Sequence, residues 1–364
     1  MGVTSTRVHP QSPARAQSVS WRRSLLAALP AWLLARAIVL AIFAIASDRE
    51  GSDVLLVWDA AWYHNLGVYG YLDYGAQASR FFPLLPLVVG AGHLVGLPAA
   101  VWHTATCWIA ALFFAAGVYR LTVLESGSPA AGTRAAWLAQ LVPGAGVLAL
   151  GYTEALAGLL AVLYFLALRH GSVRGGLAAG VLSGLARPTG LLLAVPGLVQ
   201  TVRSRAWRRG LLLTVAPLVG TAAYLVWAWV TFGDPLIPYR VQSADDLRGG
   251  VVRSPWEYLF EDSPGGYPWQ LVLTLLVVAA VALALCAWVL PLSYVAWSLP
   301  MVGLAVTAWG LHSLPRYLAA VFPLWIAVAV VSRNRWVWWT VLALSAAGFT
   351  WVAYLVVAPA SPVP

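Results

Sequence analysis

VWDAAWYHNLGVYGYLDYGAQASRFFPLLP, residues 57–86, follows directly on a long apolar segment and decides how the rest of the chain is interpreted. It brings a carboxylate, Asp59, together with several aromatic rings, a histidine and an arginine. Ionisable side chains are costly in lipid unless they face water or a charged partner. Asp59 is therefore predicted to be a catalytic base at the extracytoplasmic mouth of a membrane enzyme.

The composition of the 364-residue chain is typical of an integral membrane protein. Hydrophobic residues make up 61% of it and charged residues 10%, and its mean hydropathy is +0.78, far from the values of an ordinary soluble domain. Apolar runs long enough to cross a bilayer recur along the chain, and helices are the expected form of such runs.

The net charge of +9 does not indicate a nucleic-acid partner. Arginines near helix ends on the cytoplasmic side, facing anionic lipid headgroups, account for it. Membrane lipids are therefore the expected surroundings, and no nucleic acid is expected as a partner.

We expect an all-α polytopic membrane protein with about eleven transmembrane helices. Residues 1–21 are predicted to form a disordered cytoplasmic tail and residues 22–364 a single transmembrane domain. Within that domain, residues 47–97 should form a first extracytoplasmic loop with interfacial helices and residues 233–268 a second external loop. The orientation follows from Arg22 and Arg23, which hold the amino end of the first span inside by the positive-inside rule.

The segment from Phe81 to Leu97 could be a second span or a helix that lies in the interface. It is apolar but short, and prolines and glycines interrupt it. If it lies flat, the basic loops that follow fall on the cytoplasmic side, as the positive-inside rule favours. The flat helix is therefore the preferred interpretation.

Several later apolar segments are shorter than the roughly 20 residues that a bilayer needs. Short helices joined by turns at membrane depth indicate backbone that lines a cavity. These segments are Ala135–Leu150, Ala155–Leu168, Gly176–Ala186 and Gly190–Gln200.

Under this topology, polar side chains from five separate places converge on one face of the membrane. An arginine in an apolar turn needs an anionic partner or a water-filled cavity. A guanidinium group can bind phosphate through two hydrogen bonds, in bidentate geometry. The converging residues are Asp59, Arg80, Glu154, Arg187 and Arg316.

Four motifs in the same order resemble a known family. WDAAWY with the following GY and FFPLLP, then GYTEA, ARPTG and LPRY, are similar to signatures of the PIG-V type of GPI mannosyltransferase and its bacterial relatives. That family belongs to the GT-C glycosyltransferase superfamily. The resemblance spans roughly residues 58–323, and the first-loop motif is its most specific part.

The resemblance implies a GT-C fold and an inverting transfer of mannose from a polyprenyl-phosphate-mannose donor to a hydroxyl acceptor outside the cell membrane. Asp59 would remove the acceptor proton, with Glu154 as a second catalytic candidate. Arg187, Arg316 and Arg80 would bind the donor phosphate. The candidates for contact with the sugar or the acceptor are Trp58, Trp62, Tyr63, His64 and Tyr152. The acceptor could be a glycolipid, a lipoglycan or a protein.

Other interpretations stay open at the level of the sequence. Asp59 could be a solvated loop residue or a helix cap, and Glu154 could form a salt bridge with an arginine. The protein could be a transporter or flippase of lipid-linked sugars, or a non-catalytic subunit of a glycosyltransferase complex. The sequence indicates no certain cofactor, and a divalent metal shared by Asp53, Asp59 and Glu154 is possible. Both cysteines lie in apolar segments, which indicates packing and not a disulfide.

Overall fold

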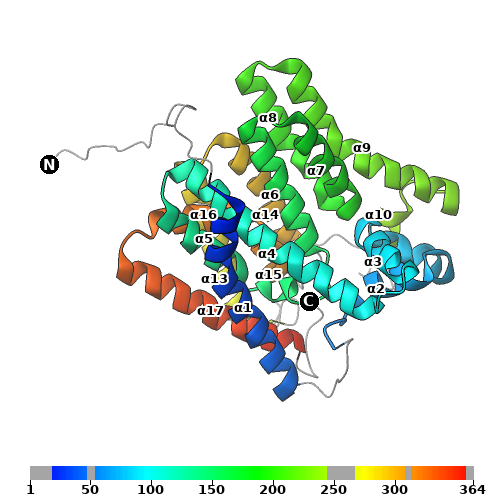
Figure 1. Cartoon of the computed structure of the whole chain (residues 1–364), viewed down its shortest axis with the longest axis horizontal. Helices are drawn as coiled ribbons and strands as arrows, with labels where there is room; N and C mark the ends of the chain where they lie inside the picture. The colour runs from blue at the N-terminus through cyan, green and yellow to red at the C-terminus, as the bar shows by residue number, and fades with distance from the viewer. Residues whose placement is uncertain (1–18, 47–53, 244–266, 308–310, 312, 358–364) are drawn as a thin grey trace.

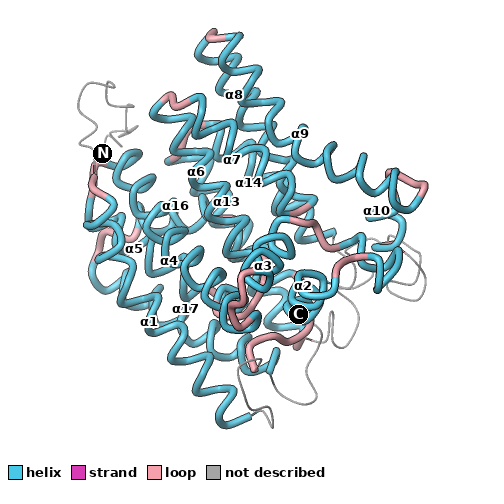
Figure 2. The backbone as a smooth tube through the Cα atoms, turned by 45° about the vertical axis from the view of Figure 1, so that its right-hand side comes forward, coloured by secondary structure: helices cyan, strands magenta, loops and turns pink. Residues whose placement is uncertain are grey.

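The computed structural model describes residues 19–46, 54–243, 267–307, 311 and 313–357, and every regular element within these ranges is a helix (Figures 1 and 2). The predicted all-α fold is confirmed. The elements in chain order are α1 (Trp21–Ala46), α2 (Asp59–Tyr69), the 3₁₀ segment η2 (Leu72–Arg80), α3 (Leu84–Leu94), α4 (Ala99–Ser126), α5 (Pro129–Leu141), η3 (Ala145–Leu148), α6 (Glu154–His170), α7 (Val173–Ala186), η4 (Pro188–Leu193), α8 (Ala194–Ser204), α9 (Trp207–Phe232), α10 (Ile237–Gln242), α13 (Trp269–Val289), α14 (Leu292–Thr307), α15 (Leu314–Ala320), α16 (Phe322–Val331) and α17 (Arg335–Val357).

Within the described residues, five helices are long and apolar enough to cross a membrane, and the count rises to six if the bent pair α15 and α16 forms one span. The five are α1, α4, α9, α13 and α17. The expected total of about eleven also included shorter segments, of which α7 and α14 appear as apolar helices of 14 and 16 residues. The chain therefore has the helices of a multi-pass membrane protein.

Prolines set the boundaries that differ most from the sequence-based expectation. The span expected at Ala135–Leu150 is instead the helix α5, which ends at Leu141 just before Pro143, followed by the short 3₁₀ turn η3. The apolar stretch near the carboxyl end is bent by 67° between α15 and α16, and Pro323 stands in the first turn of α16. A proline lacks the N–H that would continue a preceding helix and disfavours helical geometry in the residue before it.

The helices form two groups joined by α4 and α6 (Figure 1). On one side α7, α8 and α9 pack together, and on the other side α1, α5 and α17 pack together. The short helices α2, α3 and α10 gather at one end of the molecule, with α3 packed on α2 and on the start of α4. The site lies where this end meets the bundle.

The interfacial segment expected at Phe81–Leu97 contains one helix, α3, of 11 residues. At a rise of 1.5 Å per residue it is about 16 Å long, which is half of a hydrocarbon core of about 30 Å. The expected second external loop begins with a short helix, α10. Residues 1–18, 47–53 and 244–266 of the predicted tail and loops lie outside the described residues.

Candidate active site

Two carboxylates and two guanidinium groups form one linked cluster, which we call the ion cluster: Asp59, Glu154, Arg187 and Arg316. Arg316 donates from Nη1 to Asp59 Oδ2 at 2.7 Å, and its Nε lies 3.6 Å from Glu154 Oε1. The same Glu154 oxygen pairs with Nη1 of Arg187. Four of the five residues predicted to converge are thus in contact, and the ion-pair alternative for Glu154 describes its geometry.

Helix ends place each member of the ion cluster. Asp59 is the first residue of α2 and Glu154 is the first residue of α6, where the helix dipole stabilises a negative charge. Arg187 has extended backbone between the end of α7 and Pro188, which begins η4. Arg316 lies in α15, a seven-residue helix, and not in the loop that the sequence suggested.

A close backbone approach also holds Arg316 in place. Gly144 has a φ of +86° and lies so near the Pro315 carbonyl that a Cβ atom at this position would overlap it. Only glycine combines a left-handed φ with that proximity at little cost. The turn before η3 is therefore fitted to the backbone that carries Arg316.

Exposure separates the two carboxylates. The Asp59 side chain is 32% exposed, whereas that of Glu154 is 3% exposed. A base must reach the proton that it removes, so Asp59 is the carboxylate that an incoming hydroxyl could meet. Glu154, between two arginines, is placed to hold their guanidinium groups in position.

Aromatic rings enclose the ion cluster. The Arg316 guanidinium lies 5.6 Å from the ring centre of Tyr152 and 5.4 Å from that of Tyr317, and Arg187 lies 5.6 Å from the same Tyr317 ring. Burial raises the pKa of Tyr63 and that of Tyr152. Both phenols therefore stay protonated at neutral pH, so they can donate a hydrogen bond but cannot act as bases.

The remaining predicted site residues lie beside the ion cluster or apart from it. The Arg80 guanidinium lies over the rings of Trp62 and Phe81, at 5.2 and 4.8 Å from their centres. Trp62 stacks on Phe81 at 5.3 Å, and Tyr63 meets the same ring edge-on at 5.1 Å. These contacts tie α2 to η2, and a role for Arg80 or Trp62 in ligand binding stays a prediction.

Two further residues of the first-loop motif contact distant helices. Trp58 has a φ of +54° and donates from Nε1 to the Val356 carbonyl at 3.3 Å, near the end of α17. Such a conformation costs about 1–3 kcal/mol for a residue other than glycine, so the surrounding contacts must hold it. The His64 ring is parallel to that of His103 at 5.9 Å. His103 is buried in α4 and was not singled out from the sequence.

Arg36 was also missed, although a charge in the middle of an apolar segment is itself a signal of function or of a specific partner. It is 3% exposed within α1 and donates to Gln140 Oε1 at 2.5 Å and to the Leu148 carbonyl at 2.6 Å. Trp108 donates to the next carbonyl, that of Ala149, at 2.8 Å. Side chains of α1 and α4 thus fix the segment that leads to Glu154.

Replacing Arg36 with Met is expected to lower the free energy of unfolding by about 1–3 kcal/mol, because two buried acceptors, Gln140 Oε1 and the Leu148 carbonyl, lose their donor. Thermal unfolding of the purified protein in detergent measures the change. Arg174→Met is the matched control, since Arg174 is exposed and its loss should change stability by less than about 0.5 kcal/mol. Equal unfolding midpoints for the two variants would contradict the expectation.

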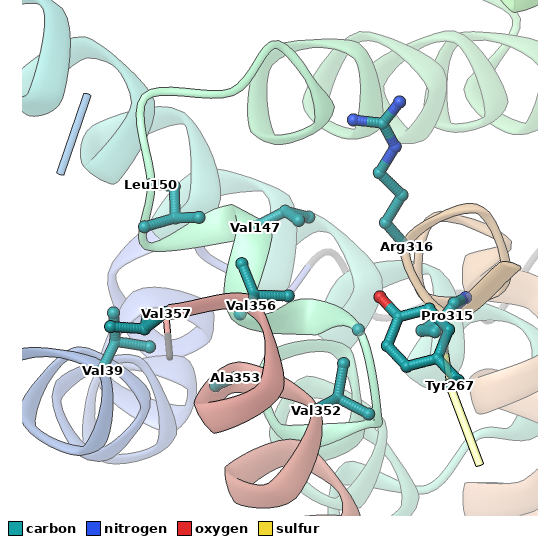
Figure 3. A pocket seen from close by; sticks show the side chains of 12 residues that line it. Val39, Val147, Leu150, Tyr267, Pro315, Arg316, Val352, Ala353, Val356 and Val357 are labelled. Carbon is teal, nitrogen blue, oxygen red and sulfur yellow. The ribbon is translucent and has the colours of Figure 1, made fainter. Parts of the chain in front are cut away.

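Two cavities adjoin the ion cluster. The first, which we call the α1–α17 cavity, has about 400 Å³ of empty space, part of it open to solvent, and is almost wholly apolar apart from Arg316 and Tyr267 (Figure 3). In the close-up, the Arg316 side chain leads away from the labelled valines of α17. Its lining residues are Val39, Gly144, Gly146, Val147, Leu150, Tyr267, Pro315, Arg316, Val352, Ala353, Val356 and Val357.

The second cavity, which we call the α6–α14 cavity, has about 460 Å³ of empty space, part of it open to solvent, and is more polar. It is lined by Glu154, Ala157, Gly158, Ala161, Ser183, Arg187, Thr189, Gly190, Leu193, Trp297, Met301, Tyr317 and Ala320. Arg316 therefore lines one cavity, and its partners Glu154 and Arg187 line the other.

The described residues contain no group of three or more His, Cys, Asp and Glu side chains that could hold a metal ion. Of the three carboxylates considered for a shared divalent ion, Asp53 lies outside the described residues, and Asp59 and Glu154 each pair with arginine. Cys107 and Cys286 are both buried and unpaired with each other.

Comparison with known proteins adds a likeness in three dimensions. No family model matches the chain, and no curated protein does. The chain is similar to the apo crystal structure of the Archaeoglobus fulgidus oligosaccharyltransferase, with 14% identity, a TM-score of 0.48, and coverage of 91% of this chain and 55% of the other. It is also similar to a complex of AglB from that organism with an inhibitory peptide and a dolichol-phosphate. That match has 15% identity, a TM-score of 0.47, and coverage of 93% of this chain and 56% of the other.

A third structure of the Archaeoglobus fulgidus enzyme, a complex with Zn and sulfate, gives 14% identity, a TM-score of 0.46, and coverage of 90% of this chain and 52% of the other. The chain spans about half the length of the structures that it matches. The function proposed below therefore rests on the site and not on this likeness.

Proposed function

We propose that the chain is a membrane glycosyltransferase of the GT-C type, which transfers a sugar from a polyprenyl-phosphate carrier to a hydroxyl acceptor at the extracytoplasmic face. One observation carries the proposal: Arg316 pairs with the partly exposed Asp59 and also lines the apolar α1–α17 cavity. A lipid-linked sugar phosphate needs a cation for its phosphate, an apolar space for its chain and a nearby base for the acceptor.

In the proposed reaction, the acceptor hydroxyl attacks the anomeric carbon while its proton passes to the Asp59 carboxylate. The new bond joins the acceptor oxygen to that carbon. The bond between the carbon and the phosphate oxygen breaks, and the electron pair leaves with the polyprenyl phosphate. A single displacement of this kind inverts the anomeric centre. The hydrogen bond from Arg316 to Oδ2 orients the carboxylate.

The arginines would stabilise the negative charge of the leaving phosphate. Preorganised cations in a site with little water stabilise charge that develops in the transition state. Each guanidinium group can donate two parallel hydrogen bonds to phosphate oxygens. Arg316 and Arg187 are both held by Glu154, so their positions are set before a ligand arrives. Arg80 is a third candidate, close to the aromatic rings of Trp62 and Phe81.

Mannose is the proposed sugar because of the motif resemblance to the PIG-V type of GPI mannosyltransferase. The acceptor would be a glycolipid, a lipoglycan or a protein with an accessible hydroxyl. The cell membrane is the proposed location, with the active site on its outer side, since the positive-inside rule places the amino end of the first span in the cytoplasm.

The test is to incubate membranes from cells that express the full chain, and from cells that lack it, with polyprenyl-phosphate-mannose labelled in the sugar. Mass analysis of the glycolipids and proteins should show a mannosylated product that depends on the chain. The proposal would be overturned if neither the membranes nor the purified protein transferred the label to any acceptor, including water.

A further inference from the structure

We propose that the α6–α14 cavity binds the sugar of the donor, and that Trp297 recognises it. This inference rests on the proposed function. It assigns a ligand to a space that the motif residues alone do not define, since Trp297, Ser183 and Met301 lie outside the four motifs.

The cavity starts at the ion cluster and extends into the bundle. Glu154 and Arg187 line one end of it. Ala157, Gly158 and Ala161 follow at three, four and seven residues after Glu154, which places them on one face of α6. Seven residues of helix span about 10 Å, and each of these three residues has a side chain of at most one carbon. Trp297 and Met301 of α14 complete the wall.

Two residues of this wall carry buried polar atoms without a partner, and these atoms indicate the chemistry of the ligand. Among the described residues, Trp297 Nε1 is a buried donor without an acceptor, and Glu154 Oε2 is a buried acceptor without a donor. A buried polar atom without a partner costs about 1–3 kcal/mol and calls for an explanation. Both belong to residues that line the same cavity.

A sugar satisfies both kinds of atom, because each of its hydroxyl groups can donate and accept a hydrogen bond. A phosphate group accepts hydrogen bonds and would leave the carboxylate oxygen unpaired. A polyprenyl chain would satisfy neither atom. The hydroxyls of Ser183 and Thr189, which also line the cavity, add further partners for a polyhydroxyl ligand.

The conservative substitution Trp297→Phe isolates this role. The indole packs against Phe165 and Phe322, with ring centres 5.9 and 5.1 Å apart, and a phenyl ring keeps most of that contact while it removes the N–H. Trp325→Phe is the matched control, since Trp325 is also buried but donates to the Ala319 carbonyl at 3.1 Å and does not line the cavity.

The experiment measures the affinity of the full-length protein in detergent for polyprenyl-phosphate-mannose and for the same polyprenyl phosphate without sugar. We expect Trp297→Phe to weaken binding of the sugar-bearing lipid up to about tenfold, the value of one good hydrogen bond, and to leave binding of the sugar-free lipid unchanged. Trp325→Phe should leave the ratio of the two affinities as in the wild type.

A second variant covers the case in which Trp297→Phe does not fold. Ala157→Leu fills the cavity at a position three residues after Glu154 and should weaken only binding of the sugar-bearing lipid. Equal effects on the two lipids, or no effect of either variant, would overturn the assignment of the cavity while the proposed function stands. Failure of the wild type to bind either lipid would overturn the proposed function itself, and this inference with it.

Discussion

Replacing Asp59 with Asn is expected to lower the rate of sugar transfer by a factor of about 100 to 10,000, the usual contribution of a general base. Asparagine has nearly the same shape, and its carbonyl oxygen can still accept the hydrogen bond that Arg316 donates, but it cannot take up a proton from the acceptor. Initial rates with labelled donor, at equal amounts of inserted protein, measure the effect.

The control is Asp73→Asn, because Asp73 is an exposed carboxylate of η2 in the same segment of the chain, and its loss should leave the rate within about twofold of the wild type. The same pair of variants separates an enzyme from a transporter of lipid-linked sugars. A transporter needs no base. The catalytic role of Asp59 would be refuted if Asp59→Asn translocated the lipid-linked sugar at the wild-type rate while neither the wild type nor the variant transferred the sugar to an acceptor.

Replacing Arg316 with Met should have the largest effect on stability. Arg316 is 8% exposed on its side chain and stands between two carboxylates, Asp59 and Glu154. Removal of one partner from a buried ion pair costs about 3–5 kcal/mol because the remaining charge stays buried and unbalanced. We expect roughly the lower end of that range, since Asp59 is about one third exposed and water screens it in part.

The unfolding midpoint in detergent measures this loss, and Arg240→Met is its matched control. Arg240 pairs with Asp234 at 3.1 Å but is 69% exposed, so the loss of that pair should cost no more than about 1 kcal/mol. Arg316→Lys keeps the charge and should recover part of the stability, yet bind polyprenyl phosphate more weakly than the wild type because lysine lacks the planar fork. If Arg316→Met and Arg240→Met unfolded at the same temperature, the buried pairing would be refuted.

Several features could be predicted from single segments because their causes are local. The apolar length and sparse charges of Trp21–Ala46 are enough to predict a spanning helix. Pro188 and Gly190 likewise predict the helix break at Arg187. Polar residues in apolar turns also identified Asp59, Glu154, Arg187 and Arg316 as candidates, since each carries a solvation cost that needs a local explanation.

Other features depend on segments that are far apart in the sequence. Arg316 lies inside α15, before the bend between α15 and α16, and its partner Asp59 is 257 positions away. No local sequence pattern predicts that Glu154 forms ion pairs with two arginines at once. Likewise, Arg36 has a visible charge, but its acceptors on α5 and η3 become evident only when those elements pack on α1.

The sequence by itself determined the helical class, the membrane setting and the types of side chain available for chemistry, because hydrophobic length, helix breaks and the cost of buried charge are properties of neighbouring residues. Only the tertiary structure decided which carboxylate stays exposed, which arginines are already paired, and where the two cavities lie. Those outcomes depend on the approach of helices distant along the chain, and exposure and pairing are set by what packs against a side chain.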